Sequence, residues 1–315
     1  MTIRAGFEIA SFTPERGVAE AAVLAAQAVT ALRDQIPLLP ERWTRPEAFE
    51  TRLTDLVARN PAVLALVDGT VAGYMAGMRL DWSQGRWAFS PEWANLATGP
   101  VAGRMREDMY AALAEQWIAD DRRAHFVSLL PTDAVGRETM AWLGFGITNV
   151  DGLRALEPSA ASLPLDVRRA GPSDMDGVTL LERDLRDHLA STPLFLRYPP
   201  FDPAELAENL ADERVATLMA TDHRGPLAML RIGPASSDAS TIIRDEGTAS
   251  ITRAFTRADR RGEGVAATLL NAALEWARAE GYRRCAVDFE SANLLAARYW
   301  PRHFEIVGVT VGRRL

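Results

Sequence analysis

The sequence predicts an α/β protein in which two similar halves follow one another along the chain. Strand-like and helix-like segments alternate throughout, and a stretch rich in Pro, Ser and Ala, Glu157–Pro164, separates the halves. A length of 315 residues with 48% hydrophobic and 24% charged residues suits about two globular domains. We therefore expect an N-terminal domain over residues 1–157 and a C-terminal domain over residues 165–315.

The first half contains four helical patterns and several strand patterns. The predicted helices cover residues 15–32, 46–59, 104–120 and 134–142. The predicted strands cover residues 1–12, 86–97, 124–130 and 147–150, with a hairpin over residues 62–78. The hairpin turns at Asp68-Gly69, a dipeptide typical of a two-residue turn.

The second half repeats this order. Its predicted helices cover residues 174–190, with Ser173 as N-cap, then 203–212 and 265–280. Its predicted strands cover residues 165–169, 248–256 and 283–290, with a hairpin over 215–232. When Trp117 is laid on Trp276, Trp142 falls near Trp300 and Phe145 near Phe304. The chain is therefore predicted to be an internal repeat of domain size.

The stretch Arg257–Leu270 reads R-A-D-R-R-G-E-G-V-A-A-T-L-L and joins a predicted strand to a predicted helix. Gly262 and Gly264 lie where backbone N–H groups have no intrahelical partner and the helix dipole is positive. Glycines allow a close approach, and a phosphate suits several convergent N–H groups. The loop alone is weak evidence, because ordinary turns also hold glycines and neither a Walker loop nor G-x-G-x-x-G is present.

Neighbouring segments add a family resemblance. Arg261-Gly-Glu-Gly-Val-Ala266 resembles the (Arg/Gln)-x-x-Gly-x-(Gly/Ala) signature of the GCN5-related N-acetyltransferases (GNAT). The segment 291–304, with Asn293, Ala296, Tyr299, Trp300 and Phe304, resembles that family's Asn-x-x-Ala…Tyr/Trp…Gly-Phe segment. The resemblance implies two tandem GNAT acyl-CoA N-acyltransferase domains, each a mixed, mostly antiparallel sheet flanked by helices. It also implies transfer of an acetyl group from acetyl-CoA to an amine.

The resemblance further implies which residues bind acetyl-CoA. Backbone N–H groups of the loop would hold the pyrophosphate with the charge of Arg261, exposed backbone of the preceding strand would bind the pantetheine arm, and Asn293 is a further contact. The expected coenzyme-binding residues are Ala254, Phe255, Thr256, Arg261, Gly262, Glu263, Gly264, Val265, Ala266, Ala267 and Asn293.

The reaction also needs groups that move protons, because an alkylammonium is not a nucleophile near neutral pH. Candidate bases are Glu246, before the loop-preceding strand, and Asp288 or Glu290, which share one face of the next strand. Tyr299 is the candidate acid, although Trp300 occupies the family's usual tyrosine position and His303-Phe304 stands where Gly-Phe is usual. Each carboxylate could equally be a solvated surface group, and solvent could replace the tyrosine. The expected catalytic set is Glu246, Glu290 and Tyr299.

The two halves are expected to differ in coenzyme binding. In the alignment above, Gly264 falls on Met105 and Ala266 falls on Glu107. A methionine side chain would crowd a phosphate and a carboxylate would repel it. The N-terminal domain is therefore predicted to be degenerate, to bind no coenzyme, and to complete the acceptor site or stabilise its neighbour.

The Pro/aromatic loop after the first helix of the second half is expected to form the acceptor wall. Its candidate residues are His188, Phe195, Arg197, Tyr198 and Phe201, although the aromatic rings could equally be core. A net charge of −7 mildly favours a cationic acceptor, such as an aminoglycoside-like amine.

Composition limits the other possibilities. The single cysteine, Cys285, excludes an intramolecular disulfide, and four scattered histidines argue against a metal site. The acidic balance argues against nucleic acid, and no signal peptide or membrane span is recognisable, so a cytoplasmic monomer or homodimer is expected. Alternatives are a mycothiol synthase-type tandem acetyltransferase, a non-catalytic CoA-binding sensor or structural protein, and an ATP site, which would lack its lysine.

Overall fold

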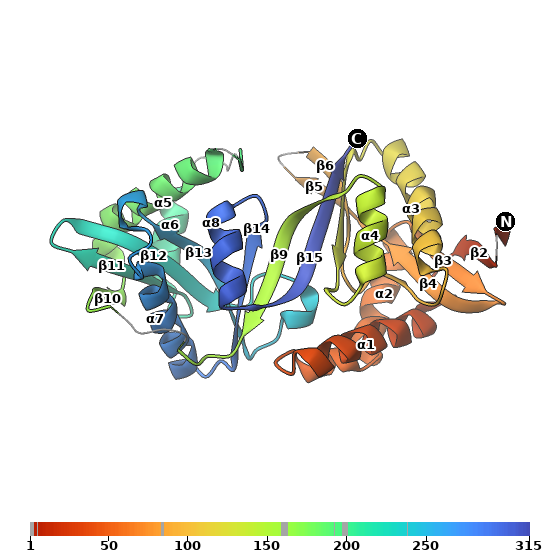
Figure 1. Ribbon diagram of the computed structural model, residues 1–315, viewed down its shortest axis with the longest axis horizontal. Helices are drawn as coiled ribbons and strands as arrows, with labels where there is room; N and C mark the ends of the chain where they lie inside the picture. The colour runs from red at the N-terminus through yellow and green to blue at the C-terminus, as the bar shows by residue number, and fades with distance from the viewer. Residues whose placement is uncertain are drawn as a thin grey trace. The chain divides into compact units, whose positions relative to one another are not determined.

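The computed structural model describes residues 3–4, 6–82, 85–158, 163–191, 193–196, 201–237 and 239–315. Contacts divide the chain into two compact units. Unit 1 comprises Met1–Val150, Ser240–Ile242 and Ile306–Leu315, and unit 2 comprises Asp151–Ala239 and Ile243–Glu305. The expected second domain, 165–315, included the last ten residues, which instead pack with unit 1. The predicted α/β class is confirmed, because both units are sheets flanked by helices (Figure 1).

Unit 1 contains four α-helices and most of the strands of the first half of the chain. The helices are α1 (Val18–Gln35), α2 (Glu47–Arg59), α3 (Ala102–Ala119) and α4 (Ala134–Trp142). The strands are β1 (Ile3–Arg4), β2 (Phe7–Ser11), β3 (Ala62–Val67), β4 (Thr70–Ala76), β5 (Met78–Trp82), β6 (Gly85–Ser90), β7 (Asn95–Ala97) and β8 (Ala124–Leu129). Two further strands, β9 (Gly146–Arg154) and β15 (Glu305–Arg314), carry the chain out of unit 1 and back into it.

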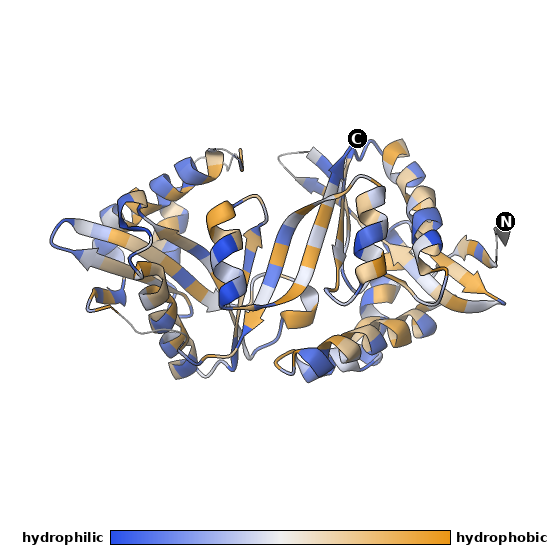
Figure 2. Cartoon of the chain, in the orientation of Figure 1, coloured by the Kyte–Doolittle hydropathy of each residue, from blue (hydrophilic) through white to orange (hydrophobic). Residues whose placement is uncertain are grey.

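Unit 1 has strands in the order β1-β2-β3-β4-β7 and β15-β8-β6-β5. Hydrophobic residues concentrate along β3 and β4, whereas α3 and α4 alternate hydrophobic and hydrophilic positions (Figure 2). The apolar face of α3 packs Met109, Leu113 and Trp117 into the core against β8, as the helical spacing predicts.

The predicted strand over residues 86–97 is broken in two. β6 pairs in parallel with β8, from Trp87–Ala124 to Ser90–Val127, whereas β7 pairs antiparallel with β4. Pro91 follows β6 directly, and a proline has no N–H to donate to a sheet. The single-strand prediction was therefore wrong at this point.

Unit 2 follows the predicted order closely. Its strands are β10 (Asp166–Arg169), β11 (Ala216–Asp222), β12 (Gly225–Pro234), β13 (Thr248–Thr256) and β14 (Arg284–Glu290), hydrogen-bonded in that order. Its helices are α5 (Met175–Ala190), α6 (Pro203–Ala211), α7 (Val265–Ala279) and α8 (Leu294–Tyr299). The N-cap of α5 is Asp174 rather than Ser173, because a 3₁₀ turn over Pro172–Asp174 precedes the helix.

Helices cover both faces of the unit 2 sheet. Leu181 and Leu185 of α5 pack with Met219, Met229 and Phe255 on one face, together with apolar residues of α6. α7 packs against β11 and β12 on the other face (Figure 1). The alternation of side chains along each strand supplies both faces with apolar groups.

β13 and β14 diverge along their length. Their parallel pairing runs from Thr248–Arg284 to Ile251–Val287, whereas β13 continues to pair with β12 as far as Thr256. The register of β13 against β12 shifts between Arg231 and Ile232, which marks a bulge next to the divergence. The part of β13 beyond Ile251 therefore has an edge that β14 does not pair.

Candidate functional site

The loop before α7 has the backbone geometry expected for an anion site. Gly262 has φ 80° and Gly264, the N-cap of α7, has φ 90°, both in the left-handed region that favours glycine. Thr268 donates to the carbonyl of Gly264 at 3.1 Å, so the N–H groups of the preceding helical residues lie ahead of the intrahelical ladder. A Cβ at Gly262 would meet nothing within 4 Å, which leaves that side of the loop open to a ligand.

A pocket of ≈ 310 Å³ opens beside this loop. We call it the α7 pocket. It is lined from α5, β12, β13, the loop, α7 and α8 by Leu185, His188, Met229, Leu230, Ala254, Phe255, Thr256, Arg260, Arg261, Gly262, Gly264, Val265, Ala266, Ala267, Leu269, Asn293, Leu295, Ala296, Tyr299 and Trp300. All predicted coenzyme-binding residues except Glu263 are therefore brought together around one space.

Glu263 is held away from the α7 pocket. Its carboxylate pairs with Arg260 at 2.9 Å, and Arg260 also pairs with Asp222 of the β11–β12 turn at 2.5 Å. The pKa of Asp222 is lowered by a backbone hydrogen bond from Arg224 and by Arg260. These ion pairs fasten the loop to the rest of unit 2.

Arg261 lies along the end of β13. Its Nε donates to the carbonyl of Thr256 at 3.0 Å, and its guanidinium carbon lies 5.6 Å from the ring centroid of Phe255. Both contacts keep the guanidinium beside the open loop.

Asn293 and Tyr299 enter the α7 pocket from opposite ends of α8. The side chain of Asn293 caps this helix by accepting from Ala296 N–H at 3.3 Å. The hydroxyl of Tyr299 is buried and has no hydrogen-bond partner among the described residues. Burial raises the pKa of Tyr299 to about 12, against a smaller lowering by Arg154. Trp300 is 7% exposed and also lines the pocket, so the displaced tyrosine and its neighbour share it.

The predicted carboxylate bases lie elsewhere. Glu246 is exposed in the turn before β13, at the end of that strand opposite the loop. Asp288 and Glu290 are half-buried while Val287 and Phe289 are buried, as strand alternation predicts, but neither carboxylate lines the α7 pocket. The sequence prediction chose Glu246 at the entry of the strand before the loop, and Asp288 and Glu290 from their shared face of the strand after the helix, and neither position fixes which side chains face the pocket.

His188 is the pocket-lining imidazole, and sequence reasoning assigned it only to the acceptor wall. It lies in the last turn of α5, and its ring centroid lies 6.5 Å from that of Phe255. Phe195 is 69% exposed, and Phe201 lines a separate cavity. Arg197 and Tyr198 lie outside the described residues.

Three elements of unit 1 have equivalents in unit 2: α3 matches α7, β8 matches β14 and α4 matches α8. The start of β8 matches the start of β14, the cap Asp133 of α4 matches the cap Asn293 of α8, and the ends of α3 and α7 match, all with one common offset along the chain. This offset pairs Arg104 with Gly264, Met105 with Val265 and Arg106 with Ala266. The alignment on Trp117 and Trp276 was therefore one residue out of register.

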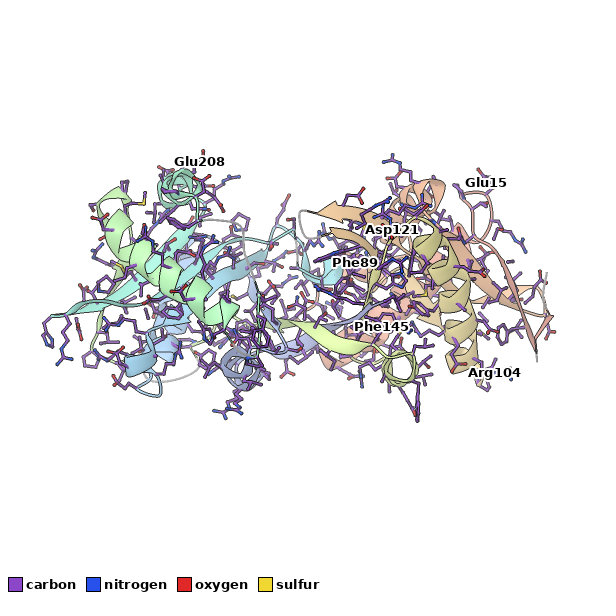
Figure 3. The ribbon with its side chains drawn as sticks, turned by 90° about the horizontal axis from the view of Figure 1, so that it is seen from above. Glu15, Phe89, Arg104, Asp121, Phe145 and Glu208 are labelled. Carbon is purple, nitrogen blue, oxygen red and sulfur yellow. The ribbon has the colours of Figure 1, made fainter. Side chains whose placement is uncertain are left out.

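In the corrected alignment, unit 1 lacks an open loop because the equivalent residues are helical. α3 already begins at Ala102, so the equivalents of Gly262–Gly264 are wound into its first turn, and Arg104 lies exposed there (Figure 3). Met105 is 1% exposed in the core and Glu107 is exposed on the helix, so neither lies at a phosphate loop. The prediction that Met105 would crowd a phosphate and that Glu107 would repel it was therefore wrong.

A buried arginine, Arg106, lies in unit 1 at the position that corresponds to Ala266 of the α7 pocket. Arg106 is 1% exposed, bonds the carbonyl and Oδ1 of Asn95 at 3.2 and 2.9 Å, and pairs with Asp133 at 2.5 Å. Asn95 also donates to the carbonyl of Ser128 at 3.0 Å, which joins β7 to β8. In unit 1 the equivalent of the slot between β13 and β14 is filled by this ion-pair network.

Other features of the described chain are structural. Cys285 is fully buried, and burial raises the pKa of its thiol to about 12, which opposes a reactive role. No group of three or more potential metal ligands occurs among the described residues. None of the described helices combines the length and apolar character that crossing a membrane requires.

Comparisons with known proteins agree with this geometry. Residues 183–304 match the model of the acetyltransferase (GNAT) family. A GCN5-related N-acetyltransferase from Sphaerobacter thermophilus is similar over 99% of this chain and 97% of its own, with 15% identity and a TM-score of 0.60. A tandem GNAT protein from the clavulanic acid biosynthesis pathway is similar over 98% of both chains, with 13% identity and a TM-score of 0.51. No curated protein matches the sequence significantly.

The fold thus contains one open loop, before α7 in unit 2, and one counterpart that is wound into α3 in unit 1. Residues 183–304 are a domain of the GNAT family, and the whole chain has the tandem GNAT fold. The predicted family and fold class are thereby confirmed.

Proposed function

We propose that the protein is an N-acetyltransferase that transfers the acetyl group of acetyl-CoA to a primary amine of a small molecule. The observation that supports this proposal most strongly is the α7 pocket, which joins an anion-binding helix start to an unpaired strand edge. Acetyl-CoA carries both a pyrophosphate and an amide-containing arm, and its thioester supplies the electrophilic carbonyl carbon.

The residues of unit 2 suit this donor. Loop N–H groups and the guanidinium of Arg261 would bind the pyrophosphate, and the edge of Ala254–Thr256 would accept and donate amide hydrogen bonds to the arm. Ala266 and Ala267 leave room because their side chains are small. Unit 1 is proposed to bind no coenzyme, since the equivalent space holds Arg106.

We assign proton acceptance to His188. The transfer forms a C–N bond and breaks a C–S bond, so the amine loses a proton and the departing sulfur gains one. Among the described residues that line the pocket, His188 supplies the imidazole that can act as a general base, and no Asp or Glu lies among them. The proposal therefore moves the base from Glu246 or Glu290 to His188.

We assign donation of the second proton to Tyr299. Its pKa of about 12, raised by burial, keeps the phenol protonated throughout the working pH range. Its hydroxyl has no described protein partner that would compete for the proton.

The experiment is release of free CoA thiol from acetyl-CoA during a screen of small amines. The 315 residues contain no lysine, so side-chain amines of the protein cannot act as acceptors and the background is low. His188→Gln should lower kcat by about 100-fold or more while the Kd of acetyl-CoA stays unchanged. Glu246→Gln and Glu290→Gln are the matched controls, with effects below about threefold. Binding of acetyl-CoA without thiol release for any amine would favour the CoA-binding sensor instead.

A further inference from the structure

Arg154 is a charged residue of unit 2 that acts on the proposed proton donor, Tyr299. It is the last residue of β9, in the part of that strand that belongs to unit 2. Burial raises the pKa of Tyr299, and the positive charge of Arg154 acts in the opposite direction. Tyr299 lines the α7 pocket, whereas Arg154 is not among its lining residues. An effect of Arg154 on the reaction would therefore pass through Tyr299.

Two backbone carbonyls and one aromatic ring fix the guanidinium of Arg154. Its Nε donates to the carbonyl of Ala155 at 3.0 Å, and its Nη2 donates to the carbonyl of Glu157 at 2.6 Å. Its guanidinium carbon lies 5.6 Å from the ring centroid of Phe304. A carbonyl accepts a hydrogen bond without neutralising the donor, so these contacts hold a positive charge in one place.

The third nitrogen of this guanidinium and the hydroxyl of Tyr299 are both left without a partner. Nη1 of Arg154 and the phenolic oxygen of Tyr299 are buried, and neither has a hydrogen-bond partner among the described residues. A buried polar group without a partner costs free energy, which a group that arrives or forms during the reaction can recover. Both groups are donors, so the group that suits them is negatively charged.

The other titratable groups nearby leave Arg154 as the source of positive charge beside Tyr299. The ring centroid of His303 lies 4.5 Å from that of Tyr299, but burial and two nearby arginines lower the pKa of His303 and favour its uncharged form. Burial raises the pKa of Cys285 to about 12, which keeps its thiol neutral. Burial lowers the pKa of Arg154, and of the groups that oppose this effect the exposed Glu157 acts less than Tyr299 does.

The charge matters because the proposed proton transfer is uphill. The pKa of Tyr299 is about 12, whereas an alkyl thiol has a pKa of about 8.5. A phenol of this kind gives its proton to a departing thiolate only if the phenolate that remains is stabilised. A nearby positive charge stabilises a buried anion.

We infer that Arg154 is a positioning residue of the acetyl transfer, which stabilises the phenolate of Tyr299 while the departing sulfur takes the phenolic proton. This inference rests on the proposed function. The amine nitrogen bonds to the carbonyl carbon, the C–S bond breaks, and its electron pair stays on the sulfur, which accepts the proton of Tyr299. The amine gives its proton to His188, and water returns a proton to the phenolate.

The first test uses free CoA and needs no turnover. The thiol of CoA bound to the full chain is titrated by the ultraviolet absorbance of its thiolate, after subtraction of the protein alone. In Arg154→Gln the pKa of this thiol should be higher by about one, a tenfold change in its acid constant, because the phenol becomes a weaker donor to the sulfur. In the Tyr299→Phe background the same substitution should change it little. An equal pKa with and without Arg154 would overturn the inference.

The second test is a double-mutant cycle on thiol release. Arg154→Gln should lower kcat about tenfold, with the Kd of acetyl-CoA unchanged, and should have an effect below about twofold in the Tyr299→Phe background. Arg154→Lys should retain part of kcat because it keeps the charge. Arg298→Gln, on an exposed position of α8, is the control. Equal losses in both backgrounds, or Arg154→Lys as impaired as Arg154→Gln, would reduce Arg154 to a structural residue.

The two tests separate this inference from the proposed function. A thiol pKa that depends on Arg154, without thiol release for any amine, would sink the acetyl transfer and keep the action of Arg154 through Tyr299 on the coenzyme sulfur. Thiol release at the original rate in Arg154→Gln would keep the transfer and overturn the role of Arg154. Failure of the protein to bind CoA would overturn both.

Discussion

The two units begin equivalent helices in different ways. In unit 2 the residues Gly262–Gly264 form an open left-handed loop before α7, whereas in unit 1 their equivalents, Ala102–Arg104, form the first turn of α3. A regular first turn replaces the left-handed glycine conformations that give the loop before α7 its open shape. The two units therefore differ by one turn of helix at equivalent positions, open before α7 and wound in α3.

The two units also differ at the next positions of α7 and α3 and at the caps of α8 and α4. Ala266 and Asn293 leave space in the α7 pocket, whereas their equivalents Arg106 and Asp133 form a buried ion pair. Burial lowers the pKa of the Arg106 guanidinium, and the nearby Asp133 carboxylate opposes that effect. Burying both charges costs desolvation free energy, and their mutual attraction offsets this cost only while both partners are present. In unit 1 the network of Arg106, Asn95 and Asp133 thus holds β7 and β8 together at the positions where unit 2 has the α7 pocket.

The largest expected effect comes from giving unit 2 the residues of unit 1. The double variant Ala266→Arg with Asn293→Asp should weaken acetyl-CoA binding by about 1000-fold, roughly 4 kcal/mol, because the new ion pair fills the slot beside β13. Calorimetry of the full chain measures it. Glu275→Arg, on an exposed position of α7, is the control and should bind normally. If the double variant bound acetyl-CoA as tightly as the original protein, the Arg106–Asp133 pair could not explain the difference between the two units.

Removing the arginine of unit 1 should have the next largest effect. Arg106→Ala leaves Asp133 and Asn95 without their buried partner, and we expect a loss of about 3 kcal/mol in the free energy of unfolding. Urea denaturation measures the loss. Arg104→Ala, exposed and two residues earlier, should change stability by less than about 0.5 kcal/mol. A similar stability of both variants would remove the structural role of the network.

A third difference between the two units is the side chain at the position of Tyr299. The unit 1 equivalent of Tyr299 is Thr139, whose hydroxyl donates to the carbonyl of Val135 at 2.8 Å. Tyr299→Phe should lower kcat by about 100-fold and leave the Kd of acetyl-CoA unchanged. Since the pKa of Tyr299 is about 12, no fall of kcat from its deprotonation is expected up to about pH 10. An unaltered kcat in the variant would assign the proton to solvent.

The smallest expected effect lies at the starts of α1 and α5. Neither α1, with N-cap Gly17, nor α5, with N-cap Asp174, has a side-chain cap hydrogen bond, but Asp174 bonds Arg168 at 2.6 and 2.7 Å and Gly171 N–H at 3.0 Å. Arg168 and Gly171 lower the pKa of Asp174 from 3.8 to about 2. A lowered pKa stabilises the fold above the unfolded value, and this stability is lost as the pH falls from about 4 to 2.

Asp174→Asn should therefore cost about 1 kcal/mol at pH 7 and less at pH 3. Thermal unfolding of both proteins between pH 7 and 3 measures the difference. A difference in Tm that grows as the pH falls would have the wrong sign for this ion pair.

The sequence predicts much of the fold and part of the site. The order of elements, the loop glycines and Asn293 follow from local patterns, because each depends on a few neighbouring residues. The break after β6 is also marked locally, by Pro91, and the prediction of one strand over residues 86–97 overlooked it. The return of residues 306–315 to unit 1 and the burial of Arg106 between β7 and α4 depend on contacts between distant segments. A tryptophan match displaced the alignment of the halves by one residue, and one residue rotates a helix by about 100°.

The most direct test is the stoichiometry of acetyl-CoA binding to the full chain by calorimetry. Cutting the chain at the linker would remove β15, which pairs with β8 of unit 1, so the intact protein is required. We predict one site per chain, absent in the variant that combines Ala266→Arg with Asn293→Asp. Two sites, or one site that survives in that variant, would contradict the assignment of the coenzyme to unit 2.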